Sequence, residues 1–175
     1  MVRFFSVGSI ASVIFLAAFS LPSSTSLAAD AEEDFHVMVS ESIGALKISM
    51  PAARVKTLIA GRPALGAMEE WGADGKFHQT WKYAALGLEI GMTSDTKKSA
   101  QTVDSISVSG PSLQTKKGIY VGSPEADVVK AYKQDINKDD RKPGEGVVVG
   151  SIYGGLMFGI KKGVVTNIFL GAMAE

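Results

Sequence analysis

Few residues in this chain could carry out acid–base or nucleophilic chemistry. There are two histidines, His36 and His78, and no cysteine, which excludes thiol catalysis and thiolate metal sites. The adjacent acidic pairs Glu69–Glu70 and Asp139–Asp140 fall in expected loops, where neighbouring side chains rarely converge on one ion. No Ser-His-Asp motif or phosphate-binding loop accompanies them. The sequence therefore predicts no catalytic group, no metal site and no cofactor.

The first 29 residues have the pattern of a secretory signal. Arg3 is the only charged residue before Asp30, residues 7–19 are apolar, and small and polar residues follow up to Ala29. This order is typical of a cleaved signal peptide, and the apolar run is shorter than the ~20 residues of a membrane span. We expect cleavage near residues 28–31, no membrane span in the mature chain, and a bacterial protein that is periplasmic or secreted. The competing interpretation is an uncleaved membrane anchor.

Charge is balanced along the chain. The chain has eighteen basic and eighteen acidic residues, which gives a formal net charge of +0. This gives no electrostatic reason to expect a nucleic acid as partner. Without disulfides, the hydrophobic core has to stabilise the exported protein unaided.

The chain after the signal reads as two similar halves, residues 30–109 and 110–175. In the first, Pro51 is suited to begin a helix and the Gly-x-Pro at 61–63 to end it. Extended stretches follow at 77–83, 86–92 and 103–108, and residues 35–39 also alternate as a strand does. In the second half Pro124 begins a helix, and extended stretches follow at 147–151, 155–160 and 165–170.

These elements predict an α+β fold made of two tandem helix-plus-antiparallel-sheet repeats, with continuous or nearly continuous sheets and the helices packed on one sheet face. The glycine-flanked stretch 87–92 matches 155–160, and 103–108 matches 165–170, which indicates an internal duplication. The alternative is that such coincidences arise in any α+β chain. The expected core is Val55, Leu58, Ile59, Leu88, Ile90, Ile106, Val128, Tyr132, Leu156, Phe158, Ile168 and Leu170.

Three motifs of the first half resemble a known family. Residues 46–51, residues 55–63 with their Gly-x-Pro ending, and Thr80-Trp81-Lys82-Tyr83 are similar to the small outer-membrane-assembly proteins of the SmpA/OmlA type. As a tandem repeat, the pattern resembles the β-lactamase inhibitory protein, in which two such units form one curved sheet. The resemblance covers most of residues 42–171. It implies that the chain works by binding another protein.

An exposed apolar patch is expected on the sheet face opposite the helices. Met157 and Phe169 have the parity opposite to the core residues of their strands, and Tyr153 shares it. Trp71 and Trp81 are expected to extend the patch. These five residues form the predicted partner-binding site.

Four glycines also have outward parity: Gly87, Gly91, Gly155 and Gly159. A sheet face without side chains invites the close approach of a partner. The alternative is that these glycines let the sheet bend.

The favoured function is an exported, non-enzymatic module that binds another protein, as an inhibitor or as a neutralising, immunity-type protein. Exposed aromatic side chains are typical of the centres of such interfaces. Two alternatives stay open. One is a scaffold for envelope assembly, and the other is a carboxylate-based hydrolase of cell-wall sugars, which would require a cleft with two carboxylates ~5–10 Å apart.

Overall fold

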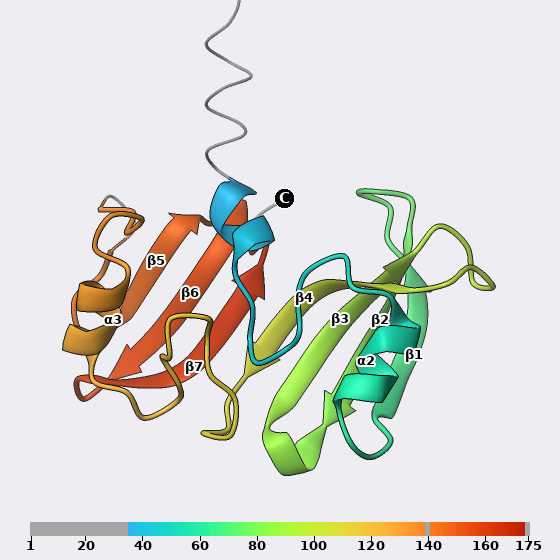
Figure 1. Cartoon of the computed structure of the whole chain (residues 1–175). Helices are drawn as coiled ribbons and strands as arrows, with labels where there is room; N and C mark the ends of the chain where they lie inside the picture. Colours follow the sequence, from blue (N-terminus) through green and yellow to red (C-terminus); the bar gives the residue numbers. More distant parts are fainter. Residues whose placement is uncertain (1–34, 139–140, 174–175) are drawn as a thin grey trace, which may run out of the picture.

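The computed structural model describes residues 35–138 and 141–173. Within them seven strands form one antiparallel sheet, in the order β1-β2-β3-β4-β7-β6-β5 (Figure 1). The strands are β1 (Ala64–Glu70), β2 (Phe77–Tyr83), β3 (Leu88–Ser94), β4 (Thr102–Val108), β5 (Gly146–Ser151), β6 (Gly154–Lys161) and β7 (Val164–Gly171). The expected signal segment, residues 1–29, and the Asp139–Asp140 pair lie outside the described residues.

Helices are a minor part of the described chain. The α-helices α2 (Ala52–Leu58) and α3 (Glu125–Ala131) have seven residues each, residues 35–40 are also helical, and η1 (Ala84–Leu86) is a single 3₁₀ turn. Pro51 and Pro124 precede the α-helices in an extended conformation, as the sequence indicates, because proline has no N–H to offer a helix interior. Both α2 and α3 have one fully buried side chain, Val55 in α2 and Val128 in α3.

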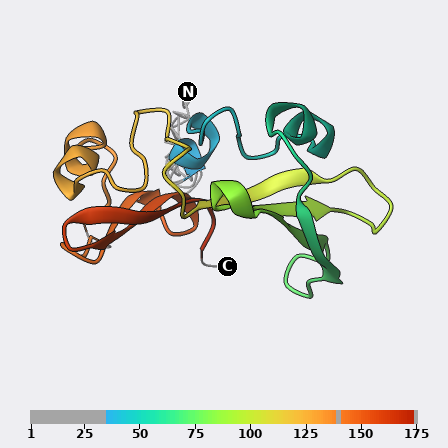
Figure 2. The same ribbon diagram turned by 90° about the horizontal axis from the view of Figure 1, so that it is seen from below.

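The predicted fold class is wrong. The described chain is mainly one seven-stranded antiparallel sheet with short helices, not two helix-plus-sheet repeats with helices packed on the sheet. The physical reason is that a two-turn helix with one fully buried valine covers too little of the sheet to form a layer. The inner face, on which α2 and α3 lie (Figure 2), is closed largely by connecting segments. These contribute the buried residues Ile43, Leu46, Ile59, Ile119 and Tyr132.

The strand interiors follow the alternation expected from the sequence, because successive side chains of a strand point to opposite faces. All the expected core residues are buried except Leu58, which is half-buried. The buried apolar side chains of the strands, Met157 excepted, belong to one core cluster that includes Leu88, Ile90, Met92, Ile106, Val108, Val149, Leu156, Phe158, Ile168 and Leu170. The inner face of the sheet therefore supplies most of the core.

The two halves of the chain join at the centre of the sheet. β4 pairs with β7 through Ile106 opposite Leu170, Ser107 opposite Phe169, and Val108 opposite Ile168. The pairs Ile106–Leu170 and Val108–Ile168 are buried and belong to the same cluster. The core therefore runs through this seam without interruption.

Two local predictions are also wrong. Residues 35–40 are helical rather than extended, and β1 begins at Ala64, where no strand was predicted. Nearly every residue of β1 is exposed, so its sequence lacks the buried–exposed alternation by which strands are detected.

Candidate functional site

The face of the sheet opposite α2 and α3, here called the outer face, is covered by no helix of the described chain (Figure 2). Its first half carries the ion pair between Lys82 Nζ and Glu89 Oε1, at 2.9 Å. Its second half carries Phe169, which lies opposite Ser107 on β4 and Met157 on β6. This face is the one on which the sequence predicts partner binding.

Two of the five predicted site residues are buried and cannot contribute exposed surface. Trp81 is 3% exposed and lies on the inner face, opposite Ile90. Its indole Nε1 donates a hydrogen bond to Gln79 Oε1, and Lys56 Nζ lies 5.1 Å from its ring centroid. The placement of Trp81 in the outer patch is therefore wrong, because β2 turns this side chain into the core.

Met157 is 6% exposed, although it has the outward parity that the sequence predicts. Its neighbours across the strands are Val148 and Phe169. Since side chains directly opposite on one face lie in contact distance, these two flank Met157 and leave it little solvent contact. Met157 therefore supports Phe169 rather than forming a surface of its own.

The other three predicted residues reach solvent at different places. Phe169 is half-buried on the outer face. Tyr153 is 52% exposed in the turn between β5 and β6, where its backbone N–H donates to Ser151 Oγ. Trp71, 43% exposed, follows β1 at the other end of the molecule. The structure thus does not gather the predicted residues into one patch.

Trp71 belongs to a cluster that the sequence did not indicate. Its ring stacks on His78, with centroids 3.9 Å apart and an interplanar angle of 11°. His78 Nε2 lies 3.0 Å from Asp74 Oδ2, and the Lys76 N–H donates to Asp74 Oδ1. The hydrogen bond from Lys76, and then the neighbouring His78, lower the pKa of Asp74 below its ordinary value.

The cluster forms because the chain reverses between β1 and β2. The Gly75 N–H donates to the Trp71 carbonyl at 2.9 Å, which folds Asp74 back over the start of β2. The Asp74-Gly75 turn signal could have revealed this pairing, since Asp–Gly favours a tight reversal. The sequence predicts no partner for His78, because the approach of Asp74 depends on how this turn closes.

Contacts within the chain explain why glycine occupies the outward positions Gly91 and Gly159. The sheet register shifts between Gly91 and Met92 and again between Gly159 and Ile160, so both glycines adjoin β-bulges, where glycine is favoured. A Cβ at Gly91 would meet Ser105 Oγ, and one at Gly159 would meet Asn167 Oδ1. These positions therefore favour the sheet-bending interpretation over a partner's close approach.

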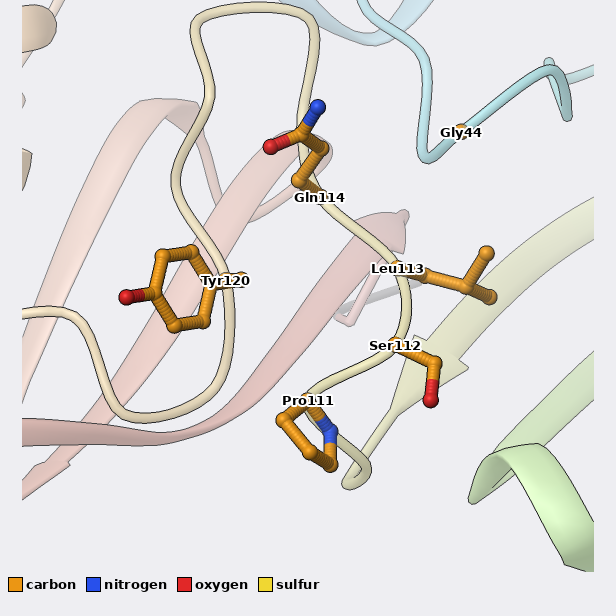
Figure 3. A pocket seen from close by; sticks show the side chains of 6 residues that line it. All are labelled: Gly44, Pro111, Ser112, Leu113, Gln114 and Tyr120. Carbon is orange, nitrogen blue, oxygen red and sulfur yellow. The ribbon is translucent and has the colours of Figure 1, made fainter.

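Two hollows of the described surface are lined by other segments. One of about 320 Å³ is lined by Gly44, Pro111, Ser112, Leu113, Gln114 and Tyr120. Figure 3 shows Leu113 and Tyr120 pointing to opposite sides of their segment, so their side chains do not converge on one point.

A second hollow of about 300 Å³ contains Glu41 and two lysines. Lys116 donates to the Ser40 carbonyl, and Lys117 pairs with Asp135 at 3.0 Å. Both cations are thus engaged within the chain rather than directed at a ligand.

Among the described residues, no group of three or more histidine, aspartate or glutamate side chains is placed to hold a metal ion. None of the helices in residues 35–138 and 141–173 is long and apolar enough to cross a membrane. Comparison with protein-family models, curated proteins and solved structures finds no match for this chain.

Proposed function

We propose that the protein is an exported module that binds another protein through its outer sheet face, as an inhibitor or a neutralising protein. The observation that supports this most directly is that no helix of the described chain covers the outer face, which carries the Trp71–His78 stack near one end and Phe169 in the second half. Partly exposed aromatic side chains supply large contact area at low entropic cost and dominate protein interfaces.

The polar groups between these aromatic residues suit a protein partner. Lys82 and Glu89 neutralise each other, and serines occupy outward positions on β4. A surface of isolated aromatic residues surrounded by balanced polar groups is typical of transient, non-obligate interfaces. Binding of this kind requires surface complementarity and no covalent step.

The expected localisation of the protein supports the same proposal. The signal-like segment at residues 1–29 favours export to the periplasm or beyond. The motifs similar to small outer-membrane-assembly proteins favour a partner that is itself a protein. We place this partner among envelope or secreted proteins.

The experiment is affinity capture with the purified protein and three single variants. Trp71→Ala and Phe169→Asp alter the outer face, while Tyr120→Ala removes an aromatic ring of similar exposure from the segment that lines the hollow in Figure 3. Captured proteins from periplasm and culture fluid are quantified by mass spectrometry.

We expect both outer-face variants to lose a specific partner by at least about tenfold, because hot-spot aromatic residues contribute ~2 kcal/mol or more. Tyr120→Ala should retain it. Equal capture by all four proteins, with unchanged circular dichroism, would exclude the outer face as the binding surface.

A further inference from the structure

The two edges of the sheet differ. The edge at β5 is covered by residues 135–137, and Lys142 pairs with Gly146 at the start of the strand. The Asn137 N–H donates to the Val148 carbonyl at 2.9 Å, and the Gly150 N–H to the Asp135 carbonyl at 2.7 Å. At the other edge, β1 pairs with β2 and with no other strand of the described chain (Figure 1). Half of its backbone N–H and C=O groups therefore face away from the sheet, ready to pair with another strand.

Charge is distributed unevenly along this free edge. At its start, a hollow of about 350 Å³ is lined by Lys56, Gly61, Arg62, Pro63, Leu65 and Trp81. It contains two cations and no acidic side chain. β1 ends in Glu69 and Glu70. Arg62, Glu69 and Glu70 form no ion pair within the part of the chain that the structure describes.

The faces of β1 follow from its pairing with β2. Leu65 lies opposite Trp81 and Met68 opposite Gln79, so both point to the inner face. Ala64 lies opposite Lys82 and Glu69 opposite His78, so both point to the outer face. A β-bulge between Leu65 and Met68 divides the strand into two short runs, one at each end.

We propose that a second copy of this chain pairs with β1 through its own β1, antiparallel and related by a two-fold axis. The register is set by the requirement that side chains opposite each other in the two copies point to the same face of the sheet. Met68 then lies opposite the partner's Leu65, and Glu69 opposite the partner's Ala64. The bulge then lies at the two-fold axis, and each regular run meets the other run of the second copy.

This register matches both polarity and charge. Leu65, which is 59% exposed in the single copy, is covered by the partner's Met68 on the inner face. Glu70 lies beside the partner's Arg62, whose positive charge has no acidic neighbour in its own hollow. Because the acidic residues end β1 and Arg62 lies just before its start, an antiparallel pair brings the two charges together twice, as a two-fold interface requires.

The first test is the mass of the purified protein by sedimentation equilibrium over a range of concentrations, with charge-reversed variants. We expect a monomer–dimer equilibrium. Arg62→Glu and Glu70→Arg should each weaken it by at least about tenfold, since each reversal occurs twice per dimer. The double variant should restore dimerisation. Lys130→Glu, an exposed position on α3, reverses the same charge away from the edge and should have no effect.

The second test uses the absence of cysteine from the chain. An Ala64→Cys chain mixed with a Glu69→Cys chain should form a disulfide-linked heterodimer, since these positions lie opposite each other on one face. Ala64→Cys mixed with Glu70→Cys should not, because Glu70 lies on the other face. The cysteine pairs report the register even where a charge-reversed variant folds poorly.

A protein that stays monomeric at all concentrations would overturn the inference, whether residues 1–34 or another protein covers β1. A dimer that is insensitive to both charge reversals would do the same. Neither outcome decides the proposed function, which is tested separately by affinity capture with Trp71→Ala at this end of the sheet and Phe169→Asp in the other half.

Discussion

Phe158 is the residue whose contribution to stability can be stated most directly. Its side chain is 2% exposed, and its ring centroid lies 5.6 Å from that of Tyr132. We expect Phe158→Ala to lower the free energy of unfolding by about 3–5 kcal/mol, because it removes buried contacts and leaves a cavity. Urea denaturation measures this. Phe158→Leu, which fills most of the space, should cost clearly less. A loss below ~1 kcal/mol for alanine would contradict the placement of this ring.

Two glycines provide a matched comparison. A Cβ at Gly110 would collide with the carbonyl of Leu86, which is backbone and cannot move aside, whereas a Cβ at Gly159 would meet the side-chain oxygen of the exposed Asn167. We expect Gly110→Ala to destabilise the protein by about 1–3 kcal/mol, and Gly159→Ala by less than about 1 kcal/mol. Thermal or urea denaturation of the two variants tests this order, and the reverse order would contradict it.

Tyr132 predicts how stability depends on alkaline pH. Burial raises the pKa of its hydroxyl well above the ordinary 10.0, and the hydroxyl donates to Thr115 Oγ1 at 2.8 Å. The folded state therefore holds this proton when the unfolded state loses it. The contribution of Tyr132 to the free energy of unfolding is therefore fully present below pH 10. Above pH 10 it falls, by up to ~1.4 kcal/mol per pH unit.

The measurement is urea denaturation between pH 8 and 11, with Tyr132→Phe as the comparison. The variant loses the hydrogen bond to Thr115 at every pH, but should show a shallower decline above pH 10. Parallel curves for the two proteins would assign the decline to other groups, such as Tyr83, whose pKa is also raised by burial.

At the level of single residues, alternation predicted burial well inside strands and poorly beside them. Leu88, Ile90 and Phe158 follow the period of two that a half-buried strand imposes. Parity alone did not predict that Met157 would be covered, because coverage depends on the cross-strand neighbours Val148 and Phe169. The pairing of Asp74 with His78 was missed because it depends on how tightly the intervening turn closes.

At the level of elements, the sequence predicted the strands whose side chains alternate between buried and exposed, and missed β1, whose side chains do not. β1 consists largely of small or exposed residues on both faces, so no periodicity marks it. Residues 35–40 alternate in sequence yet form a helix, because a window of six residues cannot separate the two periods. The helices were placed correctly by Pro51 and Pro124, but their short length, which overturns the predicted repeats, has no comparable sequence signal.

The short helices should open before the centre of the sheet does. Because α2 and α3 each have a single fully buried side chain, little apolar surface opposes their local unfolding. We expect their amide hydrogens to exchange at least about tenfold faster than those of Ile106 and Ile168 in β4 and β7. Hydrogen exchange followed by NMR checks this. Equal protection would mean that the helices unfold only with the whole sheet.

At the level of the whole molecule, the seam between β4 and β7 predicts a single unfolding transition. Ile106, Val108, Ile168 and Leu170 belong to one core cluster across the seam, so neither half keeps its core without the other. Differential scanning calorimetry should show one transition with equal calorimetric and van't Hoff enthalpies. Ile168→Ala should shift that transition as a whole. Two resolved transitions would instead indicate that the halves fold independently.

The covered edge at β5 has a consequence for how far association can proceed. A sheet with two open edges can add molecules at both ends, and its assemblies grow into fibres. In this protein residues 135–137 and Lys142 occupy one edge through their own backbone hydrogen bonds, which leaves β1 as the free edge of the sheet in the described part of the chain. A dimer joined through β1 leaves only the two β5 edges at its ends, and both are already covered by the chain's own residues. The stoichiometry is thus limited to two by the chain itself, and raising the protein concentration should fill the dimer without producing higher aggregates.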